Sequence, residues 1–246
     1  YRFGLFKQSF EDGRQVEAPD DWTKHGDPWS VRREDESVIV RFANFSVRAV
    51  PYDMPVIGLR GVIRTLRLWK AEPVEPIDMP AFNDQNYEKA SREAVRAADM
   101  TALLYPGDSK RAGKTLRLRQ QYLLCSATVQ DLLRQCPQRE RFAEQFAVQL
   151  NDTHPTMAVP ELIRILTSEG MDFEQAAEIA FRAFSFTNHT VMPEALECWS
   201  ESLMRAVAPE LIPIIRRLDE RLRAQGHEPV GIRLDSGDLA YLSREA

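Results

Sequence analysis

The fold class is decided by the stretch Val148-Gln149-Leu150-Asn151-Asp152-Thr153-His154-Pro155, which joins a short apolar run to a polar loop. The apolar run over 146–150 predicts a buried strand, and the loop is followed by a helix expected over 160–168. The same order recurs at 184–190, where a short expected strand leads into a second polar loop. Alternating strands, loops and helices are typical of an α/β protein with a mostly parallel sheet. Ligands bind such sheets at the carboxyl ends of the strands, so both loops mark an expected site.

The rest of the chain divides into a β-rich first third and a second part in which strands and helices alternate. Apolar and polar residues alternate in the manner of strands over 37–50 and 62–69, and the segment 51–55, with two prolines, is expected to end the first of these. A short strand is expected over 1–6, followed by a polar loop. Helical spacing predicts helices over 83–105, 115–135 and 209–223, and Asp172 is expected to cap a further helix.

Composition excludes several classes of protein. The 246 residues are 43% hydrophobic and 28% charged with a net charge of −5, so bulk charge attracts neither nucleic acid nor an anionic membrane. Cys125, Cys136 and Cys198 are far apart, which argues against a disulfide framework or a zinc site and favours a reducing, cytoplasmic compartment. No run of 18 apolar residues suggests a membrane span. Because the chain begins within an expected strand and ends within an expected helix, we expect a fragment.

The two polar loops carry the candidate site residues Asp152, His154 and His189. Asp152 and His154 could line a polar ligand pocket, could bind a metal, or could serve a turn in which Asp satisfies its own backbone. A metal site lacks a third ligand at a recognisable spacing, so no metal is expected. His189 could contact a sugar or a phosphate, or could be a histidine held by backbone groups.

A basic cluster follows the turn at Gly107-Asp108 and contains Lys110, Arg111, Lys114, Arg117 and Arg119. These residues could bind phosphate beside a mobile loop, or they could form a solvated helix face, which is the usual role of a charge run. Neither a glycine-rich phosphate loop nor a GxSxG motif occurs, so nucleotide binding and serine hydrolase chemistry of those types are disfavoured.

Together these segments resemble the α-glucan (glycogen or maltodextrin) phosphorylase family from about residue 1 to 223. The segments that carry the resemblance are 1–29, 50–71, 104–133, 148–166 and 187–199. The resemblance implies the N-terminal domain of a two-domain, GT-B-like glycosyltransferase, present here in part. It implies phosphorolysis of terminal α-1,4 glucosidic bonds to glucose 1-phosphate, with α-1,4-glucan and phosphate as partners. It further implies that full-length family members are often homodimers and hold pyridoxal 5'-phosphate on a lysine, with the phosphate of that cofactor serving acid–base chemistry.

By the same resemblance, Asp152 and His154 lie beside the glucosyl subsite and His189 contacts the sugar. Residues 105–109 match a mobile gate loop with Asp108 at its acidic position, and Arg117 lies just behind it. The family usually has Asn where this chain has Gly107, which implies a more flexible loop. The family's glycine-rich stretch and its cofactor lysine match nothing here. No cofactor is therefore expected on this chain, which should be inactive alone or serve only as a glucan-binding fragment.

The C-terminal segment 225–243 resembles nicotinate phosphoribosyltransferase instead. Residues 230–234 predict a strand, with a polar loop over 235–238 at its carboxyl end, and the resemblance implies that this is a strand of a barrel. The resemblance implies that Arg233, Asp235 and Asp238 contact nicotinate or a phosphoribosyl group. A single barrel strand cannot complete such a site, so an inactive appendage, joined from a second coding sequence, is the alternative. We therefore expect one domain over 1–223 and a helix–strand tail over 224–246.

Overall fold

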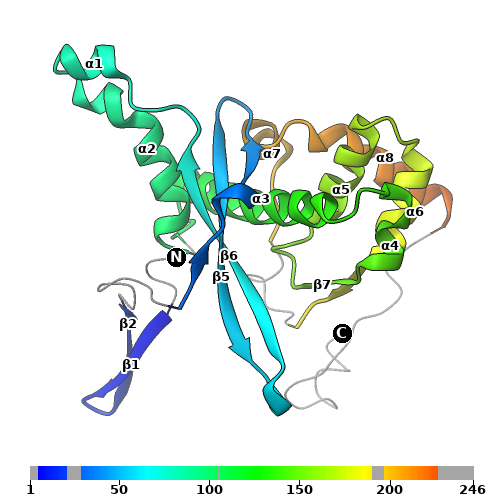
Figure 1. Ribbon diagram of the computed structural model, residues 1–246, viewed down its shortest axis with the longest axis horizontal. Coiled ribbons are helices and arrows are strands. Elements are labelled where there is room, and N and C mark those ends of the chain that lie inside the picture. The colour runs from blue at the N-terminus through cyan, green and yellow to red at the C-terminus, as the bar shows by residue number, and fades with distance from the viewer. Residues whose placement is uncertain (1–4, 21–28, 105, 190–196, 227–246) are drawn as a thin grey trace. The chain divides into compact units, whose positions relative to one another are not determined.

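The computed structural model describes residues 5–20, 29–104, 106–189 and 197–226 (Figure 1). The chain forms two compact units, Tyr1–Ala127 and Thr128–Ala246, and the boundary falls within helix α3 (Arg111–Arg134). The expected strand over 230–234 and the expected tail from residue 227 onward lie outside the described residues. None of the described helices is long and apolar enough to cross a membrane.

The first unit opens with a two-stranded hairpin. β1 (Leu5–Glu11) pairs with antiparallel β2 (Arg14–Asp20). The tight turn between them has positive φ at Asp12 (50°) and Gly13 (74°), which suits a two-residue hairpin loop. Our sequence prediction was wrong here, because the segment expected to be a polar loop pairs as a strand.

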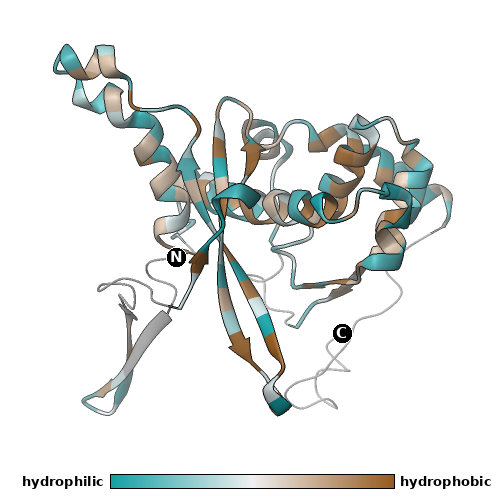
Figure 2. Cartoon of the chain, viewed as in Figure 1, coloured by the Kyte–Doolittle hydropathy of each residue, from teal (hydrophilic) through white to brown (hydrophobic). Residues whose placement is uncertain are grey.

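A four-stranded antiparallel sheet forms the main body of this unit. Its strands are β3 (Val31–Arg32), β4 (Val38–Arg41), β5 (Ser46–Ile57) and β6 (Ile63–Pro73), and β5 pairs with the other three. Single 3-10 turns lie at Glu34–Glu36 and Leu59–Gly61. Apolar residues continue along the β5–β6 hairpin toward its tip (Figure 2), where Leu59 is 91% exposed.

The expected break at 51–55 does not occur, and β5 runs through both prolines. The carbonyl of Pro51 accepts a hydrogen bond from the N–H of Arg33 at 2.9 Å, so the polar groups of Pro51 face away from β6. Pro55 stands four residues later and faces the same way, since strand residues alternate. The missing N–H groups therefore leave the β5–β6 ladder intact, which is the condition under which a strand tolerates proline.

Helices α1 (Met79–Asn83), α2 (Tyr87–Ala102) and the first part of α3 complete the unit. The side chains of Asp78 and Asn86 cap α1 and α2 by accepting backbone N–H bonds. The hydroxyl of Thr101 accepts a bond from the N–H of Ala71 at 3.2 Å and so fastens α2 to β6. The core of the unit is apolar, with Val40, Val47, Val50, Trp69, Ala97 and Met100 buried.

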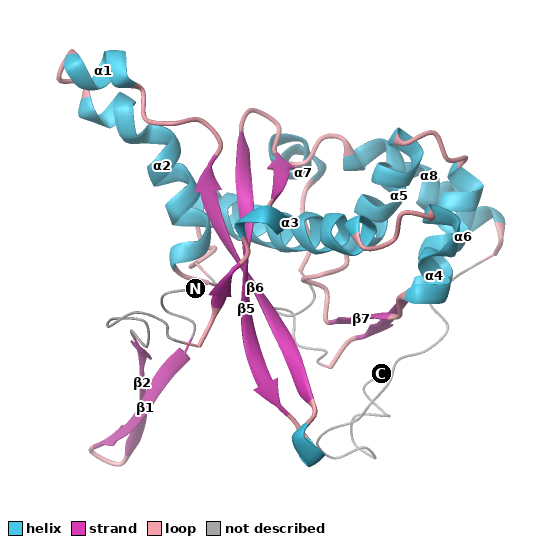
Figure 3. Cartoon of the chain, in the orientation of Figure 1, coloured by secondary structure: helices cyan, strands magenta, loops and turns pink. Residues whose placement is uncertain are grey.

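The second unit confirms the expected α/β order (Figure 3). It contains α4 (Phe142–Gln145), β7 (Val148–Asn151), α5 (Ala158–Ser168), α6 (Phe173–Ala183), β8 (Phe184–Thr187), α7 (Glu201–Val207) and α8 (Leu211–Ala224), with a 3-10 turn at Arg139–Arg141. β7 and β8 are parallel, with Val148 opposite Phe184 and Asn151 opposite Thr187. Asp172 caps α6 as predicted, through the N–H of Glu174. Phe142, Leu162, Leu166 and Leu211 are fully buried.

Candidate functional site

Two polar loops meet because β7 and β8 are parallel and end in register. The loop after β7 begins at Asp152, whose N–H donates to the carbonyl of Thr187 at 2.8 Å. Asp152 has φ +62°, in the left-handed region that Asp adopts more readily than most residues. This turn directs the chain out of the strand and places the Asp152 side chain toward the second loop.

Asp152 and His189 are neighbours, as the sequence predicted. Oδ1 of Asp152 accepts the backbone N–H of His189 at 2.8 Å, and Nδ1 of the His189 ring lies 3.5 Å from the same oxygen. The Asp152 side chain is 28% exposed and that of His189 is 48% exposed. The carboxylate is therefore oriented by the protein while part of it still faces solvent.

His154 stands beside an acid that sequence reasoning did not single out. Nε2 of His154 lies 3.8 Å from Oε2 of Glu197, whose side chain is only 7% exposed. The N–H of Glu197 donates to the hydroxyl of Thr153 at 3.4 Å, which ties this part of the chain to the first loop. The signal available in the sequence was that Glu197 is an acidic residue near the end of 187–199, the last of the segments that carry the resemblance. The group therefore offers two imidazoles and two carboxylates.

Such a group suits recognition of a polyol by hydrogen bonds, because it presents acceptors and ring N–H donors on fixed backbone. Among the residues described, no cluster of three or more His, Cys, Asp or Glu side chains could hold a metal ion.

Asp108 and Arg117 belong to the first unit, whereas the four polar side chains described above belong to the second. Asp108 is exposed in the loop before α3, and Arg117 is partly exposed on the helix. That loop packs closely on the helix at Gly113, where a Cβ would lie 1.8 Å from the carbonyl oxygen of Gly107. Gly107 itself has open space around it, so a side chain would fit there. Tyr105 and the candidate residues Arg233, Asp235 and Asp238 lie outside the described residues.

The basic cluster divides in the structure. Lys110, Arg111 and Lys114 are exposed, as a solvated helix face requires, whereas Arg119 turns inward.

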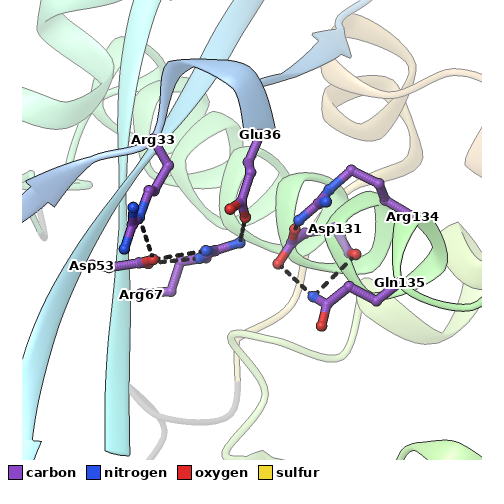
Figure 4. Close-up of polar contacts among 7 residues, drawn as sticks. All are labelled: Arg33, Glu36, Asp53, Arg67, Asp131, Arg134 and Gln135. Atoms are coloured by element: carbon purple, nitrogen blue, oxygen red, sulfur yellow. Dashed lines mark hydrogen bonds and ion pairs between the residues drawn. The ribbon is translucent and has the colours of Figure 1, made fainter.

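A second polar group in the first unit is held by ion pairs (Figure 4). Arg67 donates to both oxygens of Asp53 at 2.8 Å, and Arg33 approaches the same carboxylate at 3.3 Å. Glu36 lies 2.8 Å from Arg67. The hydrogen bonds from Arg67 lower the pKa of Asp53 below its usual value, against the opposing effect of burial. Figure 4 also shows Asp131 of α3 accepting bonds from Arg134, the last residue of the helix, and from Gln135, which follows it.

Comparison with known proteins identifies the chain. A family model described as carbohydrate phosphorylase matches residues 1–236. The chain belongs to the carbohydrate phosphorylase family. The match runs beyond residue 223, where we expected the phosphorylase resemblance to end, and nothing in the comparisons bears on a phosphoribosyltransferase.

Several phosphorylases resemble this family member at about the same level. The chloroplastic/amyloplastic alpha-1,4 glucan phosphorylase L-1 isozyme of Solanum tuberosum is 40% identical over 270 residues, covering 100% of this chain and 28% of that protein. Glycogen phosphorylase 2 of Dictyostelium discoideum is 39% identical over 90% of this chain and 25% of its own length. The glycogen phosphorylase of a Synechocystis strain is 38% identical, with 92% and 29% covered. The phosphorylase chain thus spans less than a third of these relatives.

Proposed function

We propose that this chain is part of an α-1,4-glucan phosphorylase, which splits terminal α-1,4 glucosidic bonds with phosphate and releases glucose 1-phosphate. The observation that carries the proposal is the contact between Asp152 and His189 at the ends of two parallel strands, in a chain of the carbohydrate phosphorylase family. The similar proteins named as glucan or glycogen phosphorylases support the choice of substrate.

In this proposal the four polar side chains bind and orient the terminal glucosyl unit. Oδ1 of Asp152 is taken by His189, which leaves Oδ2 to accept a bond from a sugar hydroxyl. Glu197 places a carboxylate 3.8 Å from Nε2 of His154, and this pair would supply further polar groups for the sugar. Orientation of this kind lowers the barrier by placing the glucosidic bond where the incoming phosphate can attack.

The cofactor is proposed to be bound by the remainder of a complete phosphorylase, where it supplies a phosphate for proton transfer. A lysine that forms a Schiff base is normally enclosed, because desolvation favours its neutral amine. Lys70, Lys89, Lys110 and Lys114 are all exposed, so none of the lysines whose side chains are described fits this role. Borohydride treatment of the isolated chain with pyridoxal phosphate should leave these four lysines without a stoichiometric adduct, and a stoichiometric adduct on any of them would refute the assignment.

The proposed activity is tested by expressing the uninterrupted gene that contains these residues. We expect phosphate-dependent release of glucose 1-phosphate from glycogen by the longer protein and none from the 246-residue chain. In the longer protein D152N should lower kcat/KM by about a hundredfold, since a hydrogen bond to a charged group is worth about 1.5–3 kcal/mol. D99N, at an exposed position of α2, is the matched control. Full activity of D152N would contradict the role given to Asp152.

A non-catalytic glucan-binding fragment is the nearest alternative. Retention of the isolated chain on amylose, reduced in D152N and unchanged in D99N, would favour that function for the chain alone. The phosphoribosyltransferase resemblance of 225–243 also stays a proposal, supported by the sequence around Asp235 and Asp238. Genomic sequencing across residue 224 tests whether the segment comes from a second gene. Homodimer formation is proposed for the complete protein by family likeness, and a cytoplasmic location is proposed from its three widely spaced cysteines.

A further inference from the structure

Two arginines from different helices of the first unit converge on one aromatic ring. The guanidinium carbons of Arg96 on α2 and Arg119 on α3 lie 4.6 and 5.0 Å from the ring centroid of Phe45, in the turn between β4 and β5. Phe42 stacks on the same ring, with centroids 4.7 Å apart and an interplanar angle of 10°. Three separate segments of the fold therefore fix the positions of two positive charges.

Arg119 has no carboxylate partner among the described residues. Its Nε atom is buried and donates to no acceptor there. Burial, and next the charge of Arg96, lower the pKa of Arg119, and no acid opposes them. Arg96 is paired with Glu93, 3.2 Å away on its own helix, and that side chain is 41% exposed. A buried donor left without an acceptor costs about 1–3 kcal/mol, and the nearby like charge adds to this cost.

Contact with the ring offsets only part of the cost. A guanidinium over an aromatic ring gains about 0.5–2 kcal/mol. The Nε–H of Arg119 lies in the plane of the guanidinium, so the ring gives it no acceptor. The ring also does not remove the repulsion between Arg96 and Arg119. A doubly charged anion removes the repulsion, because the terminal N–H groups of each planar guanidinium can donate to its tetrahedral oxygens.

We propose that Arg96 and Arg119, held on Phe45, form a binding site for a phosphate group, either as inorganic phosphate or as the phosphate of a small sugar ester. The site goes beyond the proposed function, whose sugar-binding residues lie in the second unit. A bound phosphate would link α2, α3 and the β4–β5 turn. It would therefore stabilise the first unit in proportion to its concentration relative to its Kd.

The proposal is tested by calorimetric titration of the 246-residue chain with inorganic phosphate and, separately, with glucose 1-phosphate, in chloride at matched ionic strength. Arg119→Gln should weaken binding of the bound species by at least about tenfold, because it removes one of two guanidinium groups. Arg92→Gln removes the same charge from an exposed position of α2 and should leave the affinity unchanged. If both species bind, free phosphate suffices as ligand; if only the ester binds, the sugar contributes.

Thermal unfolding provides a second test, because the change in Tm caused by phosphate can be measured within each variant even if the substitution alters its stability. Phosphate should raise the Tm of the wild type and of R92Q, and it should leave the Tm of R119Q nearly unchanged. Arg119→Lys keeps the charge but loses the planar fork, so its phosphate-induced shift should be intermediate. The proposal is overturned if the wild type binds neither species, or if phosphate raises the Tm of R119Q as much as that of the wild type.

Discussion

Arg67 and Arg119 are two partly buried arginines of the same unit with opposite surroundings. Arg67 on β6 lies between Asp53 and Glu36, with three N–H groups directed at carboxylate oxygens 2.8 Å away. Arg119 on α3 has a phenylalanine ring and a second arginine beside it. A compensated arginine stabilises the fold, whereas an uncompensated one leaves binding capacity for an anion. The difference is set by carboxylates that lie far away in the sequence.

Removal of the acid from the compensated pair should have the largest effect on stability. Asp53→Asn removes the carboxylate that Arg67 and Arg33 share, in a site where the Asp53 side chain is 13% exposed. We expect a loss of about 2 kcal/mol in the free energy of unfolding, measured with urea. Asp99→Asn, an exposed change of the same chemistry, should stay within about 0.5 kcal/mol of the wild type. An equally small change in the free energy of unfolding of D53N would show that the pairing of Arg67 with Asp53 does not stabilise the fold.

Low pH should reduce the difference in stability between the wild type and D53N. The pKa of Asp53 is lowered in the folded state, chiefly by the hydrogen bonds from Arg67. The stabilisation is therefore fully present above the ordinary aspartate pKa of about 4, and it is lost as the pH falls through the lower, folded-state value. The difference in free energy of unfolding between wild type and D53N should narrow as the pH falls below about 4. A gap that stays constant between neutral and acidic pH would exclude Asp53 as a titrating contributor.

Replacement of the uncompensated arginine should have a smaller effect of opposite sign. Arg119→Met keeps an unbranched side chain over Phe45 and removes the buried charge, so the variant should be unchanged or up to about 1 kcal/mol more stable in phosphate-free buffer. Arg67→Met should lose stability under the same conditions. Thermal unfolding measures the stability of both variants. Equal losses of stability in R119M and R67M would mean that Arg119 is a structural residue.

The smallest effect is expected at the acid beside Arg96. Glu93→Gln removes an exposed partner within one helix, a pair worth about 0.3–0.5 kcal/mol. The same change removes the carboxylate beside Arg96, so that Arg96, like Arg119, has no acid paired with it among the described residues. Phosphate should therefore bind a few fold more tightly. Weaker phosphate binding in E93Q, measured by calorimetry, would contradict an anion site at these arginines.

Local patterns predicted most of the second unit, because its elements are set by neighbouring residues. The strand over 148–151, the capped helix after Asp172 and the long amphipathic helix at the end of the unit all occur as expected. The first unit was less predictable. Pro51 and Pro55 are breakers by local rules, and they are tolerated only because strand pairing turns both away from β6. Pairing partners of this kind are not visible in a local pattern.

The candidate site shows the same division. The proximity of Asp152 and His189 followed from two loops at the ends of parallel strands, and the hydrogen bond between them confirms it. Glu197 was missed because its contact with His154 depends on how the chain returns after a segment with no clear periodicity. Arg96 and Arg119 lie on separate helices, and only the packing of both on Phe45 makes them a pair.

The left-handed backbone at Asp152 has a consequence for how this position tolerates change. A residue other than glycine held there costs about 1 kcal/mol, and glycine would relieve that cost. Gly at position 152 would also lose the bond that Oδ1 accepts from the N–H of His189, so its two effects on stability oppose each other, while its effect on sugar binding is a loss alone. A library of variants scored separately for cellular abundance and for glucan turnover would thus place Gly and Asp close together for abundance and far apart for turnover, and it would identify the residue as one that is kept for activity.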